Sequence, residues 1–263
     1  MKSEDVKQLA TNAIETLAAA LAAGKSEDLK RYLAAMARFH RYSLHNLMLI
    51  ALQKPTASHV AGFHTWKKLG RFVRKGEKAI FILAPMVRMK ENMEVEEQHE
   101  NRVLLGFRAR GVFDYSQTEG CELPSIGRVA GDPSQYQERL IKFVAAQRIA
   151  IAYDQAICPA RGISEGGKIT LLPGMTPAEN FATLVHELAH ELLHRADRAP
   201  TTKCQRETEA EAVAFVVCHA IGLETGTASQ DYIQLYNGDA KLLLERLERV
   251  RSAASQILDG IGG

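Results

Sequence analysis

Apolar positions in the first half of the chain change their spacing near Pro55. Residues 5–53 have a helical pattern, with a stop at Gly24 and a new start at Ser26. After Pro55 the apolar positions form short extended segments at residues 59–63, 79–84 and 103–115, which glycines and a proline separate. Residues 91–100 are acidic and without periodicity, which is typical of a solvated hairpin loop. The first half is therefore predicted to form helices followed by a small antiparallel sheet.

The second half of the chain has the pattern of a mostly helical structure. Gly and Pro residues between 120 and 133 indicate a linker, and a helix should run from there to about residue 148. Residues 149–153 and 168–172 are predicted to be short strands. Thr176, Pro177 and Glu179 have the spacing of a capping box, so a long helix should begin there. Two more helices are expected at residues 204–221 and 239–258. Together these patterns predict an α+β fold with two domains, residues 1–130 and residues 131–263.

The composition is that of an ordinary globular protein. Its 263 residues are 46% hydrophobic and 24% charged, which is enough for one large domain or two smaller ones. The chain has no run of eighteen apolar residues and no signal-peptide pattern, so no interaction with a membrane is expected. The four cysteines lack the pairing of a metal site, and we interpret them as free thiols of a protein in the reducing cytoplasm.

The charges of the chain are unevenly distributed, although its net charge is only +2. Between Arg38 and Lys90 there are eleven Lys or Arg residues and one acid, Glu77, whereas acids outnumber bases after Thr176. In residues 63–78 the only tryptophan, Trp66, lies among six Lys or Arg residues. Cations follow phosphates and aromatic faces stack on unpaired bases, which favours single-stranded nucleic acid. The alternative is a solvated basic face with Trp66 packed in the core.

The predicted helix that begins at Thr176 contains a His-Glu-x-x-His motif. His186 and His190 are four residues apart, so a helix presents both imidazoles on one face, where they can bind one metal ion. Glu187 follows the first of these histidines and can accept a proton from a water molecule that the metal polarises. The alternative is a pair of histidines whose hydrogen bonds are satisfied within the core. The motif predicts a zinc site of the metallopeptidase kind, with another divalent ion such as Mn²⁺ as the alternative.

A third protein ligand is usual at a catalytic zinc site. The helix expected at residues 204–221 offers three glutamates, and a helical wheel places Glu209 at the edge of its apolar stripe. Glu207 and Glu211 point away from that stripe. Because a carboxylate directed into an apolar face needs a partner, Glu209 is predicted to be the third ligand, with Glu211 as the second choice. His194, one turn beyond His190, could support the site.

The remaining parts of a peptidase site are less defined by the sequence. The strand expected at residues 168–172 could bind an extended peptide by strand addition, or could simply be an edge strand. Cleavage would place Glu187 between the attacking water and the leaving amine as the proton carrier. Tyr153, His219 and Tyr232 are the candidates for stabilising the oxyanion.

Both halves of the chain resemble one family, the ArdC-type anti-restriction proteins. In the first half the resemblance rests on three segments, at residues 42–46, 60–78 and 112–120. The last of these segments begins with Val-Phe-Asp-Tyr. The resemblance implies an N-terminal domain that binds single-stranded DNA. It adds Tyr42 and Asn46 to the DNA contacts that the basic segment predicts, which are Trp66, Lys67, Lys68, Arg71, Arg74, Lys75 and Lys78. For Tyr42 and Asn46, a buried structural role is an equal alternative.

The second half resembles the C-terminal domain of the same family, a zincin-like metallopeptidase domain related to the ImmA/IrrE type. The segment Glu207-Thr208-Glu209-Ala210 is similar to the segment that supplies the third ligand, and the match also places that ligand on Glu209. The resemblance implies a protein that protects incoming mobile-element DNA and cleaves an unidentified protein, such as a restriction or regulatory protein. Two alternatives are a single-strand-binding protein with a structural metal and an ImmA-like peptidase that cleaves a regulator without binding DNA.

Overall fold

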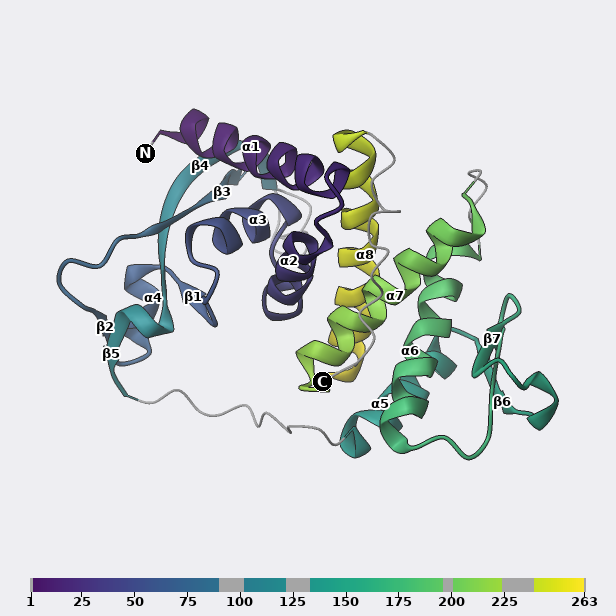
Figure 1. Cartoon of the computed structure of the whole chain (residues 1–263). Coiled ribbons are helices and arrows are strands. Elements are labelled where there is room, and N and C mark those ends of the chain that lie inside the picture. The colour runs from purple at the N-terminus through teal and green to yellow at the C-terminus, as the bar shows by residue number, and fades with distance from the viewer. Residues whose placement is uncertain (1, 90–101, 122–132, 196–200, 224–238, 263) are drawn as a thin grey trace. The chain divides into compact units, whose positions relative to one another are not determined.

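The computed structural model describes residues 2–89, 102–121, 133–195, 201–223 and 239–262 (Figure 1). They form two compact units, of which the first contains Met1–Ile14 and His45–Pro124 and the second Glu15–Leu44 and Ser125–Gly263. Both units combine helices with small sheets, which confirms the α+β class. The domain boundary expected after residue 130 stays a prediction. The acidic segment at residues 91–100 and most of the expected linker lie outside the described residues.

The first unit is built around a long antiparallel hairpin. β3 (Ile80–Met89) pairs with β4 (Arg102–Asp114), and the two-residue strand β1 (Val60–Ala61) pairs with the other side of β4. Two helices, α1 (Ser3–Ala22) and α3 (Leu44–Gln53), supply apolar side chains to one face of this hairpin. The resulting core contains Val6, Leu9, Ala10, Leu49, Phe81, Leu83 and Ala109.

Helix α3 covers the outer edge of β3 with two side-chain amides. The Asn46 amide donates to the carbonyl oxygen of Leu83 and accepts from its N–H, each at 2.8 Å. The Gln53 amide makes the same pair of bonds with Phe81, each at 2.9 Å. Asn46 and Gln53 are seven residues apart, which is about two helical turns, so both amides lie on one face of α3. Phe81 and Leu83 are two residues apart, so their bonded groups lie along one edge of β3. Each amide therefore takes the place of a neighbouring strand.

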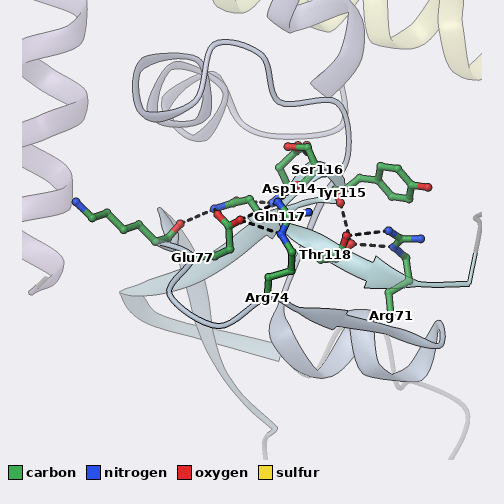
Figure 2. A network of polar contacts seen from close by, with 9 residues as sticks. Arg71, Arg74, Glu77, Asp114, Tyr115, Ser116, Gln117 and Thr118 are labelled. Carbon is green, nitrogen blue, oxygen red and sulfur yellow. Dashed lines mark hydrogen bonds and ion pairs between the residues drawn. The ribbon is translucent and has the colours of Figure 1, made fainter.

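A second small sheet and a polar network complete the first unit (Figure 2). β2 (Arg71–Val73) follows helix α4 (Phe63–Lys68) and pairs antiparallel with β5 (Thr118–Gly120). Asp114 is fully buried and accepts hydrogen bonds from the backbone N–H groups of Ser58, His59 and Ser116. Burial alone would raise the pKa of Asp114, but these bonds and that of the Ser116 hydroxyl lower it below its usual value.

The second unit is mostly helical. It contains α2 (Ser26–Phe39), α5 (Ser134–Ala146), α6 (Pro177–His194), α7 (Lys203–Ala220) and α8 (Ala240–Ile261). Helix α7 packs against α2, α6 and α8, and its apolar side chains are almost all buried. The expected capping box is present, because the Thr176 hydroxyl accepts from the N–H of Glu179 and the Glu179 carboxylate accepts from that of Thr176. The four expected helices in this part of the chain lie within a few residues of their predicted bounds.

The sheet of the second unit has the order β6-β8-β7. β6 (Ala150–Tyr153) pairs parallel with β8 (Lys168–Leu171), and β7 (Gly162–Ser164) pairs antiparallel with the other side of β8. The expectation that residues 168–172 form an edge strand is therefore wrong, since β8 is the central strand. The edge strand beside α6 is β7. Its three residues are too few to show the alternation of apolar and polar positions by which a strand is predicted. In the described part of the chain, no helix is long and apolar enough to cross a membrane.

Candidate metal centre and nucleic-acid interface

His186 and His190 lie on successive turns of α6 and point at one another. Their Nε2 atoms are 3.1 Å apart, and their rings are tilted by 76°. Both side chains are largely buried, with 22% and 16% exposure. The structure thus brings together the two predicted imidazole ligands as the helical spacing requires.

Glu207, on the first turns of α7, is the carboxylate that reaches these imidazoles. Its Oε2 lies 3.5 Å from Nε2 of His186 and 3.6 Å from Nε2 of His190. A tetrahedral ion with bonds of about 2.0–2.1 Å separates its ligands by about 3.3 Å. The three separations of 3.1, 3.5 and 3.6 Å are close to this value, so the donor set fits a divalent metal ion.

Glu209, the third ligand predicted from the sequence, does not reach the two imidazoles. Its side chain is fully buried, with Oε1 3.2 Å from the Arg246 guanidinium and Oε2 3.6 Å from Nε2 of His194. Arg249 lies 3.9 Å from the same carboxylate. The helical wheel correctly predicted that Glu209 points into the protein, but its partner there is Arg246 of α8 and not the two imidazoles. His194 thus contacts Glu209, and its ring also lies 5.6 Å from that of His190.

Glu211, one turn after Glu207, lies behind the first histidine. Its Oε2 is 3.7 Å from Nδ1 of His186, the ring nitrogen on the far side from His190. Burial alone would lower the pKa of His186, but the contacts with Glu207 and Glu211 raise it to about 9. Burial and the neighbouring His186 charge lower the pKa of His190 to about 4. These opposite shifts favour one positive charge on the pair in the metal-free protein, on the His186 ring that Glu211 contacts.

The predicted catalytic residue Glu187 lines a pocket of about 630 Å³ beside the histidines. Its carboxyl group packs against Gly162 of β7, where a Cβ atom would come within 2.7 Å of Glu187 Oε1. The Glu187 side chain is mostly buried, and burial is the main cause that raises its pKa. A carboxyl group with a raised pKa beside the metal ligands can accept and return a proton.

Glu191 holds the end of β7 in place against α6. Its carboxylate accepts from the Ser164 hydroxyl at 2.6 Å and from the N–H groups of Gly166 and Gly167 at 2.8 Å each. Sequence reasoning did not identify this residue, although it directly follows His190. Of the three expected oxyanion groups, Tyr153 and His219 do not line the pocket, and Tyr232 lies outside the described residues.

The nine residues expected to contact DNA are in different environments. Trp66 is only 2% exposed and its indole donates to the Phe113 carbonyl at 2.8 Å, so it does not offer a face to a base. Arg71 is buried against the Tyr115 ring at 3.9 Å and donates to the Thr118 carbonyl and hydroxyl (Figure 2). Asn46 is bonded to β3 as described above. These three side chains have structural roles.

The other six of these residues are at least partly accessible. Tyr42 is half-buried, and its ring contacts that of Phe39 edge-on. Arg74 is exposed but pairs with Glu77 at 2.8 Å and donates to the Ser116 carbonyl at 2.5 Å (Figure 2). The exposed cations that remain are Lys67, Lys68, Lys75 and Lys78.

Two aromatic side chains that sequence reasoning missed are exposed in the same segment of the chain as these cations. Phe63 is 50% exposed and Phe72 52% exposed, and Leu69 between them in sequence is also exposed. Phe63 is four residues before Lys67, so the two share one face of α4. We call Phe63, Lys67, Lys68, Leu69 and Phe72 the α4–β2 surface.

Comparison with known proteins gives a consistent result in both units. Residues 6–113 match the family model of the N-terminal domain of anti-restriction factor ArdC. An uncharacterized protein of Bacillus anthracis is 26% identical over 285 aligned positions, which cover 89% of this chain and 48% of that protein. The chain thus spans about half the length of this curated relative.

Two solved structures of the antirestriction ArdC protein from the R388 plasmid share the fold of this chain. One is metal-free and the other is Mn(II)-bound, and their TM-scores are 0.57 and 0.56. Each is 19% identical to this chain, and the match covers 97% of this chain and 98% of the solved one. The family match assigns residues 6–113 to the N-terminal domain of ArdC, and nearly the whole chain has the fold of the ArdC protein.

Proposed function

We propose that this chain is an anti-restriction protein that binds single-stranded DNA with its first unit and carries a metal-dependent peptidase site in its second. The observation that carries the proposal is the meeting of His186, His190 and Glu207 around one point, with Glu187 in the same pocket. A purely structural metal site has no need of a buried carboxyl group beside its ligands. Imidazole and carboxylate ligands suit zinc, and the Mn(II)-bound ArdC structure supports manganese as the alternative.

Each residue of the site has a distinct part in this proposal. When bound, the metal would supply polarisation of a water molecule and of the substrate carbonyl group. His186, His190 and Glu207 would hold it, and Glu211 would keep the His186 ring in orientation. Glu187 would accept a proton from water and give it to the leaving amine, because its raised pKa brings both proton states within reach.

The free side of β7 is where a peptide would lie. The Arg161 carbonyl accepts from the Leu172 N–H, and the Glu165 N–H donates to the Lys168 carbonyl, so these residues bond toward β8. The antiparallel alternation then directs the backbone groups of Gly162 and Ser164 away from β8. Among the described strands, none pairs with this side of β7. A peptide added here passes Gly162, and therefore Glu187.

The α4–β2 surface is the proposed site for single-stranded DNA. Exposed Phe63 and Phe72 offer ring faces on which unpaired bases can stack, and the ammonium groups of Lys67 and Lys68 can contact the phosphates. Lys75 and Lys78 are exposed further along the same segment and would extend the basic surface. The stacking role expected of Trp66 is thereby assigned to Phe63 and Phe72.

The Glu187→Gln variant tests whether proteolysis belongs to the function. The variant keeps the shape of the side chain but removes its proton-accepting group, a change that lowers such reactions by about 10²–10⁴-fold. Metal content, binding of a single-stranded oligonucleotide and survival of plasmid DNA entering a restricting host are measured together. The matched control is Glu138→Gln, an exposed glutamate of α5.

We expect Glu187→Gln to keep metal and DNA binding and to lose protection of the plasmid. Full protection by this variant would show that the chain acts as a single-strand-binding protein whose metal is structural. Protection that depends on Glu187 in a protein without DNA affinity would instead indicate a regulator-cleaving peptidase.

A further inference from the structure

The pocket beside the metal ligands has two chemically different ends. Ala160, Gly162 and Ile163 line the end near Glu187 and are uncharged. Arg195, Lys203 and Arg206 also line the pocket, and we call these three residues the basic end. A pocket with this asymmetry discriminates between substrates by charge as well as by shape.

The contacts between α6 and α7 place the basic end relative to the metal ligands. His186 lies beside Glu211, and His190 lies beside Glu207, so the two helices run antiparallel along the site. The next turn in this direction brings together the end of α6, at Arg195, and the start of α7, at Lys203. The basic end is therefore about one helical turn from the ligands, on the side away from Glu211.

The carboxylates of the pocket do not neutralise the basic end. Glu207 is engaged with the two imidazoles, and Glu191 is held by three hydrogen bonds from Ser164, Gly166 and Gly167. Arg195 approaches Glu191 only to 3.8 Å. Arg206 makes a long contact of 3.5 Å with the Thr201 carbonyl. Lys203 is near enough to Glu207 to help lower the pKa of that carboxyl group. Among the described residues at this end of the pocket, three cations therefore face two carboxylates, Glu191 and Glu207, and Glu207 is shared with the imidazoles, so positive charge is in excess.

We infer that the substrate polypeptide has an acidic side chain close to the bond that is cut, and that this side chain lies at the basic end. A peptide paired with β7 crosses the metal ligands and extends by about 3.4 Å per residue. Within one or two residues of the cut bond, its side chain is therefore level with Lys203 and Arg206. This inference rests on the proposed peptidase function and specifies its substrate class.

Short peptide hydroxamates with one variable side chain test the inference, because the hydroxamate group binds metal ions and fixes the peptide at the site. Binding to the full-length, Mn(II)-loaded protein is measured by calorimetry with compounds that carry Glu, Gln or Lys beside the hydroxamate. Acetohydroxamate, which has no side chain, reports on the metal site alone. The protein variants are Lys203→Glu/Arg206→Glu and the control Lys142→Glu, an exposed lysine of α5.

We expect the Glu compound to bind about five- to tenfold more tightly than the Gln compound at low salt, with the Lys compound weakest. For each protein, the affinity of a peptide compound is divided by that of acetohydroxamate, which removes any change at the metal site itself. On this relative scale the double variant should reverse the order of the Glu and Lys compounds, and Lys142→Glu should behave as the wild type. Equal binding of the three compounds, with normal acetohydroxamate binding, would overturn the inference and leave the metal site intact. Loss of acetohydroxamate binding to the metal-loaded wild type would overturn the proposed function and the inference together.

Discussion

Glu207 and Glu209 are two residues apart on α7, yet substituting each with glutamine should affect different properties of the protein. Glu207 is half exposed and faces the two imidazoles, whereas Glu209 is fully buried between Arg246 and His194. Glu207→Gln should therefore weaken metal binding with little effect on the metal-free fold. Glu209→Gln should destabilise the fold and leave the metal site able to bind.

The expected magnitudes follow from these environments. Removing one partner of a buried ion pair costs about 3–5 kcal/mol, since Arg246 would remain buried beside a neutral amide. For a protein of this size the loss corresponds to a fall in Tm of about 6–20 °C. Replacement of an outer partner at a metal site lowers affinity by about 10–100-fold, so loss of the proposed ligand Glu207 should lower it by at least about 100-fold.

Thermal unfolding with and without Mn(II) separates the two effects. At a free metal concentration of about 100 times Kd, binding stabilises the wild type by about 2.7 kcal/mol. With affinity reduced about 100-fold, the same concentration stabilises Glu207→Gln by only about 0.4 kcal/mol. Glu209→Gln should begin from a lower Tm and show the full metal-dependent rise. If Glu209→Gln lost that rise and Glu207→Gln kept it, the assignment of the third ligand would be reversed.

Four further substitutions test other parts of the structure. Trp66→Ala should lower the free energy of unfolding by about 3–5 kcal/mol, because it empties a core position. Phe72→Ala should keep the stability of the fold and weaken oligonucleotide binding by about 1–3 kcal/mol. Thermal unfolding measures the stability and fluorescence anisotropy the binding, and the opposite pattern would exclude the α4–β2 surface as the DNA site. The pKa of Asp114 is lowered in the fold, so its stabilisation is present above about pH 4 and is lost as the pH falls through the folded-state pKa. In urea unfolding, Asp114→Asn should therefore be less stable than the wild type at neutral pH. It should also lose less stability than the wild type between pH 4 and 2, and an equal loss in the two proteins would contradict this role of Asp114. Gly162→Ala should cost about 1–3 kcal/mol by overpacking, because the new Cβ atom meets Glu187 at 2.7 Å, and an unchanged Tm would show that β7 can move aside.

The parts of the metal centre that belong to one helix could be predicted from the sequence. The spacing of His186 and His190 determines their common face once Thr176 and Glu179 begin the helix. To predict the third ligand, the rotation of α7 and its position along α6 would have to be known, and a helical wheel gives neither. The same wheel found the burial of Glu209 and the need for a partner, but Arg246 is 37 residues further along the chain.

In residues 63–78 the sequence likewise could not show which aromatic and basic side chains are buried and which are exposed. The interleaved pattern of residues 63–78 does not reveal that α4 turns Trp66 into the core and Phe63 outward. Arg71 could not be distinguished from the exposed lysines, because its carbonyl partners are more than 40 residues away, in β5 and directly after it. The strand β7 is only three residues long, and its position beside Glu187 depends on pairing with β8.

The two amides of α3 also protect the edge of β3 against pairing with another extended chain. An exposed strand edge offers unpaired N–H and carbonyl groups to any extended chain that meets it. On β3 the outward positions are Phe81, Leu83 and the next alternate residue, Pro85. Gln53 and Asn46 occupy the first two positions, and proline has no N–H to offer at the third. Loss of either amide would therefore open an apolar hairpin to intermolecular pairing, and aggregation would increase before any loss of metal or DNA binding.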